Sequence, residues 1–122
     1  MESKVSMLSV NVPKIDPVLE YPPEVQVSGL PFLLQGWNTT FTRVEGELSE
    51  GCPIYHLDGY TLYYLFPILS ATIKKVGGSW RFLRDCDEGI PLFIKDKNIG
   101  TGNIFGSWGA QNYNMRVTAI WD

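Results

Sequence analysis

The sequence predicts a small all-β domain, an antiparallel sandwich or barrel-like meander of about seven or eight short strands, with an extended, proline-rich N-terminal arm. The 12 glycines and 8 prolines among 122 residues leave no internal run longer than ten residues without either type, which disfavours helices of ordinary length. Aromatic residues make up 13% of the chain, and large rings suit a core between sheets. Alternating or β-branched runs also recur at the spacing of small sandwiches and barrels.

Residues 1–23 differ from the rest of the chain and form the predicted arm, which leaves 24–122 as a single β-domain. The four prolines of this segment favour extended backbone and disfavour helix in the residues before them. Aliphatic side chains stand between the prolines, so the arm either lies along its own domain or inserts into a partner. We expect it to bind a partner through Val10, Val12, Ile15, Val18, Leu19 and Tyr21.

From Glu24 onward, glycine-containing turns separate the predicted strands. Asp58-Gly59 lies between two apolar runs and is a strong hairpin signal. The glycines before Trp80 predict a second hairpin. Residues 96–113 are the least regular and predict a long loop, with a short strand around Ile104-Phe105 at most. The predicted strands cover residues 24–28, 39–44, 53–57, 60–66, 71–76, 80–84, 91–95 and 115–121.

Charge and hydropathy exclude several classes of partner. The net charge is −3, so we expect no wide basic surface and no nucleic-acid binding. No apolar run approaches the roughly 20 residues that span a bilayer, so we expect no transmembrane segment. The N-terminal residues lack the basic start and continuous apolar stretch of a secretion signal. We therefore expect the chain inside cells, or within a particle or organelle assembly.

Groups suited to catalysis or metal binding are few. The only histidine, His56, lies four residues from Cys52, about 13 Å along an extended strand, so the two do not form a preformed nucleophile–base pair. Together with Cys86 they are too few and too scattered for structural zinc, and the sequence leaves open whether the cysteines are joined. The acidic turn Asp85-Cys86-Asp87-Glu88 lacks the longer alternating pattern of calcium loops, so a solvated turn is favoured. We expect no enzyme activity, metal or cofactor.

Aromatic side chains offer the remaining route to a ligand. Trp108 and Tyr113 lie among Gly, Ser, Asn and Gln in the irregular segment, so we expect them to be exposed and able to stack against a sugar. The sequence Gly78-Ser79-Trp80 recurs as Gly106-Ser107-Trp108. A turn followed by a core tryptophan explains both copies without a duplication.

A series of residues between about 24 and 95 resembles a short module found singly and in arrays. Its most specific part is Gly51-x-Pro53-x-Tyr55, then Leu62-Tyr63-Tyr64, then Gly78-x-Trp80. The module occurs in uncharacterised proteins of protists, especially dinoflagellates and other algae, and of some large DNA viruses. The resemblance implies a β fold, built on turn glycines and aromatic core residues, that serves as a building or binding unit. The proline-rich arm and the insertion at 67–70 depart from the typical pattern.

These observations favour a non-enzymatic structural or interaction module, a small subunit of a larger protein assembly that is anchored by its N-terminal arm. The alternative is a carbohydrate-binding module that uses Trp108 and Tyr113 to bind glycans. A third class, an enzyme centred on His56 and Cys52, has the least support.

Overall fold

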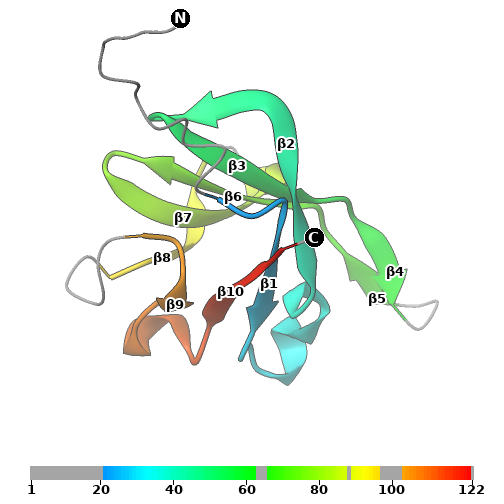
Figure 1. Ribbon diagram of the computed structural model, residues 1–122. Helices are drawn as coiled ribbons and strands as arrows, with labels where there is room; N and C mark the ends of the chain where they lie inside the picture. Colours follow the sequence, from blue (N-terminus) through cyan, green and yellow to red (C-terminus); the bar gives the residue numbers. More distant parts are fainter. Residues whose placement is uncertain (1–20, 63–65, 88, 97–102, 122) are drawn as a thin grey trace, which may run out of the picture.

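The computed structural model describes residues 21–62, 66–87, 89–96 and 103–121. Eight strands form one antiparallel sheet in the order β8-β7-β6-β3-β2-β1-β10-β9, which curls into a half-barrel (Figure 1). This confirms the predicted all-β fold. The main-sheet strands are β1 (Glu24–Ser28), β2 (Thr40–Ser49), β3 (Cys52–Leu57), β6 (Ala71–Val76), β7 (Ser79–Arg84), β8 (Pro91–Ile94), β9 (Gly106–Ser107) and β10 (Arg116–Ile120).

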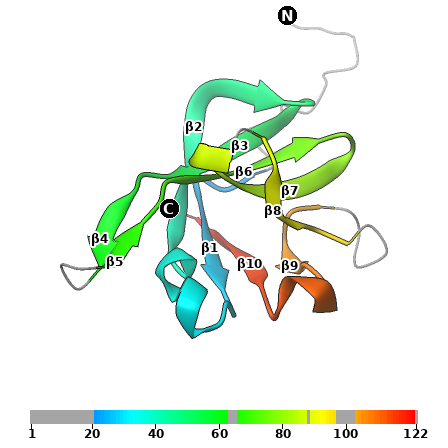
Figure 2. The same cartoon turned by 180° about the vertical axis from the view of Figure 1, so that it is seen from behind.

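A two-stranded ribbon made of β4 (Tyr60–Leu62) and β5 (Phe66–Ile68) projects from the sheet, away from β8 and β9 (Figures 1 and 2). Within the described ranges, three short 3-10 helices connect the strands. They are η2 (Phe32–Trp37), η3 (Asp85–Asp87) and η4 (Ala110–Asn112).

The hairpin predicted at Asp58-Gly59 is wrong. β3 pairs with β2 on one edge and with β6 on the other, while β4 pairs with β5. Because β2 and β6 occupy both edges of β3, the chain after Gly59 cannot pair with β3 and leaves the sheet. A Cβ on Gly59 would lie 2.9 Å from the carbonyl oxygen of Ile68, so glycine permits the close approach of the two chains at the root of the ribbon.

The predicted β6–β7 hairpin is confirmed, and a second hairpin joins β2 to β3. Both turns use left-handed backbone, at Glu50 and Gly51 in one and at Gly77 and Gly78 in the other, as two-residue hairpin turns require. The strand predicted at residues 39–44, which corresponds to β2, was expected to end at Val44. The observed strand continues to Ser49, because Gly46 takes up the register shift between Arg43 and Leu48 with a positive φ.

The tips of these two hairpins are joined, and we call this region the turn end. The Glu50 carboxylate accepts hydrogen bonds from the backbone N–H groups of Gly77 (2.5 Å) and Gly78 (2.9 Å). The Ser49 hydroxyl donates to the carbonyl of Lys75 at 2.6 Å. The bonds from Gly78 and Gly77 lower the pKa of Glu50, because they favour its ionised form.

The core fills the inside of the half-barrel and is rich in aromatic rings. Phe82 lies at its centre and contacts the rings of Trp37, Phe41 and Phe93 at centroid distances of 5.4–5.7 Å. Alternate residues of β1 point inward, and Val25 and Val27 are fully buried. The resemblance implied that its aromatic residues serve as core anchors. Of these, Tyr55, Trp80 and Phe82 are buried, while Tyr63 and Tyr64 lie outside the described residues.

Polar bonds draw the two outer edges of the sheet together. The backbone N–H of Asp96, just after β8, donates to the carbonyl of Trp108, just after β9, at 3.0 Å. Lys95 is buried, and its Nζ donates to the carbonyls of Asn103 and Phe105. Burial lowers the pKa of Lys95, because a low-dielectric surrounding disfavours the charged amine. These bonds fix the segment before β9 against β8.

The packed domain includes residues upstream of β1. The Tyr21 ring lies against Trp80 and Phe105, with centroids 6.1 and 6.3 Å away. The carbonyl of Pro22 accepts a bond from the buried hydroxyl of Tyr55 at 2.7 Å, and burial raises the pKa of that hydroxyl. Tyr21 was expected to contact a partner, whereas the ring contacts found here are within its own domain. The other predicted arm contacts, at Val10, Val12, Ile15, Val18 and Leu19, lie outside the described residues.

Candidate functional site

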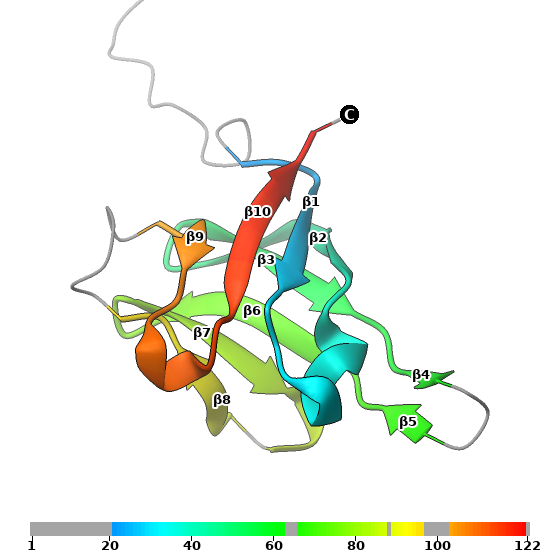
Figure 3. The ribbon, with the colours of Figure 1, turned by 90° about the horizontal axis from the view of Figure 1, so that it is seen from below.

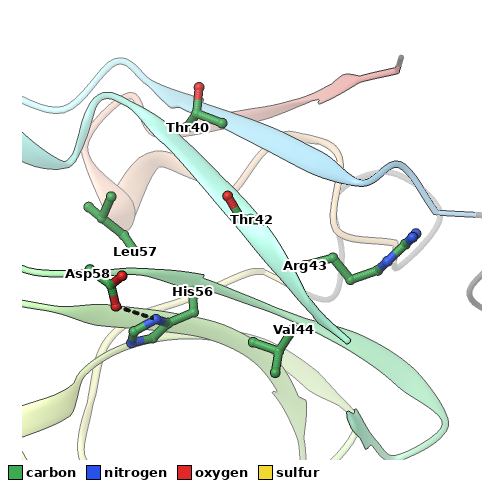
Figure 4. Close-up of a pocket in the computed structure, with 7 residues that line it drawn as sticks. All are labelled: Thr40, Thr42, Arg43, Val44, His56, Leu57 and Asp58. Atoms are coloured by element: carbon green, nitrogen blue, oxygen red, sulfur yellow. Dashed lines mark ion pairs between the residues drawn. The ribbon is translucent and has the colours of Figure 1, made fainter. Parts of the chain in front are cut away.

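Two hollows on the surface are candidates for a functional site. The first, the His56 pocket, lies on β2, β3 and the turn that follows β3, and has a volume of about 370 Å³. His56 is paired across the sheet with Thr42, and Figure 4 shows Arg43 directed away from both. The pocket is lined by Thr40, Thr42, Arg43, Val44, His56, Leu57 and Asp58.

His56 lies between two carboxylates. Its Nε2 is 2.9 Å from Asp85 Oδ2 and its Nδ1 is 3.4 Å from Asp58 Oδ1 (Figure 4 shows the second pair). Thr72 donates to the other oxygen of Asp85 at 2.9 Å. Partial burial alone would raise the pKa of Asp85, but the bonds from His56, Ser70 and Thr72 outweigh it and lower that pKa. This cluster ties together β3, β6 and the end of β7.

The structure does not bring His56 to a cysteine thiol. Cys52 lies at the opposite end of β3, where its sulfur accepts a long, weak bond from the Tyr21 hydroxyl at 3.9 Å. Cys86 is exposed, and both cysteines are free thiols. In the acidic turn, Asp85 bonds to His56 and Thr72, and Asp87 receives two bonds from Arg84, at 2.6 and 3.1 Å, that lower its pKa. Glu88 lies outside the described residues. The described ranges contain no group of three His, Cys, Asp or Glu residues placed to hold a metal.

The second hollow, which we call the η2–β5 groove, is apolar and has a volume of about 200 Å³. One wall comes from η2 and the other from β5 and the residue after it. Among the described residues that line it, Arg84 alone is charged, and it is paired with Asp87. The lining residues are Leu33, Leu34, Gly36, Trp37, Pro67, Ile68, Leu69 and Arg84.

Specific contacts hold the two walls of the groove in place. Trp37 Nε1 donates to the carbonyl of Leu69 at 2.9 Å, and the Tyr60 hydroxyl donates to the carbonyl of Gly36 at 2.5 Å. A Cβ on Gly36 would lie 2.1 Å from Cδ1 of Ile68. Glycine at this position therefore allows η2 to pack directly on β5, and the groove is formed before any ligand arrives.

Large apolar side chains of the groove lining, and of the residue that precedes Leu33 in η2, are exposed. Phe32 is 72% exposed and Leu33 is 75% exposed, and both belong to η2. Leu69, on the opposite wall, is 41% exposed. Single exposed apolar residues are common on proteins, but a cluster around an apolar hollow is typical of an interaction site. Sequence reasoning missed this cluster. The sequence feature that could have indicated it is the apolar run Leu30-Pro-Phe-Leu-Leu, which is too short and too interrupted to form an ordinary helix.

The expected exposure of Trp108 is wrong. Its side chain is fully buried, and its Nε1 donates to the carbonyl of Ile104 at 2.9 Å. The chain folds inward at this point and the indole joins the buried core, as that of Trp80 does from β7. The repeated Gly-Ser-Trp sequence was the signal that pointed to this role. Tyr113 is exposed as expected, at 55%, and stands edge-on to Phe93.

Comparisons of the chain with known protein families, with curated proteins and with solved structures found no match. Among the helices within the described residues, none has the length and apolar character needed to cross a membrane.

Proposed function

We propose that this protein is a non-catalytic interaction module, a small subunit of a larger protein assembly that is anchored by its N-terminal arm. The observation that carries the proposal is the η2–β5 groove with the exposed apolar side chains of Phe32 and Leu33 beside it. The resemblance to a repeated β-module supports the same function, and it too stays a prediction.

Binding in such a module comes from surface burial. Each Å² of apolar surface removed from water contributes about 25 cal/mol, and only the part that exceeds the entropic cost of association appears as affinity. The preformed walls of the groove reduce that cost on the module's side. The arm adds contact area without enlarging the domain, in the manner of segments that order on binding.

Deletion of residues 1–20 tests the role of the arm. The shortened chain keeps Tyr21 and Pro22, whose contacts belong to the domain. We expect it to fold, as judged by circular dichroism, and to lose the proteins that co-purify with the full chain. Unchanged co-purification by the folded, shortened chain would contradict the proposal.

The carbohydrate-binding alternative now depends on Tyr113, since Trp108 is buried. The observation that favours it is the exposed ring of Tyr113, which stands edge-on to Phe93. It predicts a glycan-induced change in the fluorescence of the full chain that Tyr113→Ala abolishes. Flat titrations across a broad glycan panel would eliminate it.

A further inference from the structure

We propose that the η2–β5 groove binds residues 8–12 of a neighbouring copy of the same chain, so that copies join through exchanged arms. The inference rests on the proposed function and names the partner that the arm binds. It combines the size of the groove, the chemistry of the segment and the position at which the described chain begins.

The apolar surface around the groove suits a short segment better than a globular partner. A stable interface between folded proteins buries about 800 Å² on each side. Leu33 and Leu69 line the groove with exposed apolar side chains, and the exposed Phe32 precedes Leu33 in η2. Because a large side chain buries about 150–250 Å² at most, these three and the hollow between them offer roughly half of that area. A few residues of extended chain would cover them.

Residues 8–12 have the matching chemistry. Leu8, Val10 and Val12 alternate with Ser9 and Asn11, so in an extended segment the three aliphatic side chains share one face at about 7 Å intervals. Residues 5–13 carry no charge. Arg84, the one charged side chain among the described lining residues, is already paired with Asp87. A neutral apolar segment therefore leaves no charge unpaired on either side.

The direction of the chain favours a neighbouring copy over the chain's own groove. Tyr21 packs beside Trp80 and Phe105, upstream of the start of β1. Figure 3 shows that η2 lies at the other end of β1, beside the β4–β5 ribbon. Residues 8–12 would have to turn back along the whole of β1, about 17 Å, to reach their own groove. The prolines at 13 and 17 instead favour an extended connection.

Sedimentation equilibrium of the full chain, from about 10 μM to about 1 mM, tests the proposal. The arm variant Val10→Asp/Val12→Asp places charge on the apolar face of the segment, and its control, Ser9→Asp/Asn11→Asp, places the same charge on the other face. The groove variant Leu33→Glu changes an exposed lining residue. Its control is Ile90→Glu, at a residue that is 69% exposed and is not a groove residue.

We expect the wild type and both controls to self-associate, and both test variants to associate at least about tenfold more weakly while keeping wild-type circular dichroism. A 1:1 mixture of the arm variant and the groove variant should form a heterodimer, because it combines one intact arm with one intact groove. Arms bound to their own grooves, or grooves reserved for another protein, would leave the wild type monomeric. That result would overturn this inference, whereas the arm-deletion experiment would still decide the proposed function.

Discussion

The two ends of strands β3 and β6 differ in whether their side chains are paired or covered within the chain. At the turn end, the Glu50 carboxylate and the Ser49 hydroxyl bond to the neighbouring hairpin, so the two tips support each other. At the other end, the ribbon and η2 are held together by Trp37 and Tyr60, yet they leave apolar side chains in contact with water. The turn end is thus paired within one chain, while the groove end leaves apolar side chains exposed.

Both ends depend on the same core, so truncation of a core ring should have the largest effect. Trp108→Ala removes a fully buried indole and its bond to Ile104, and we expect it to lower the free energy of unfolding by about 3–5 kcal/mol. Tyr113→Ala, in the same loop, should cost less than about 1 kcal/mol because its ring is half exposed. Urea denaturation measures both. Equal losses would contradict the assignment of Trp108 to the core.

A change at the groove wall should have a smaller effect on stability and a clear effect on binding. Gly36→Ala forces the new Cβ against Ile68, so we expect a loss of about 1–3 kcal/mol in the free energy of unfolding. Self-association should weaken together with it, since the groove changes shape. Gly46→Ala is the comparison, because its Cβ would meet nothing within 4 Å and its cost comes from the positive φ alone. Association that survives Gly36→Ala unchanged would argue against a preformed groove.

The turn end should respond to acid. The pKa of Glu50 is lowered in the folded protein, so its contribution is complete above the unfolded value near 4.5 and disappears as the pH falls through the folded pKa. Glu50→Gln should therefore lower the melting temperature near neutral pH, and its difference from the wild type should vanish in strong acid. Thermal unfolding across pH measures this, with Glu47→Gln on the same hairpin as the control. A difference that does not change with pH would contradict the role of the carboxylate.

The smallest effect on stability is expected at the exposed side chains of η2. Phe32→Ser and Leu33→Ser each remove an apolar side chain from the surface, and we expect changes in the free energy of unfolding within about 0.5 kcal/mol. Self-association should nonetheless weaken in both. Large destabilisation would mean that these residues contribute to the domain's own packing. That result would contradict the difference inferred between the two ends.

Local patterns in the sequence predicted most of the fold. The β6–β7 hairpin and the first strand follow from turn glycines and alternation, which act over a few residues. The exit of the chain from the sheet at Gly59 could not be predicted from local patterns, because it depends on the pairing of both edges of β3 with β2 and β6. Strand pairing of this kind is set by the whole sheet, and a strong local turn signal does not determine it.

The candidate site was harder to predict than the fold. Exposure of Tyr113 followed from its polar neighbours, but the same neighbours suggested that Trp108 is exposed, since small residues mark a turn into the core as readily as a surface loop. The groove joins η2 to a ribbon about 30 residues away, and it exists because Gly36 permits contact with Ile68. Nothing in either segment alone indicates that the two meet.

Photo-crosslinking from position 33 tests the docking role of the groove most directly. Full-length protein with a photoreactive residue in place of Leu33 is mixed with an equal amount of isotope-labelled wild type, irradiated and mapped by mass spectrometry. The account predicts adducts with residues within 5–15 of the labelled copy, and far fewer from a photoreactive residue at position 90. Adducts only within one copy, or no more than at position 90, would contradict it.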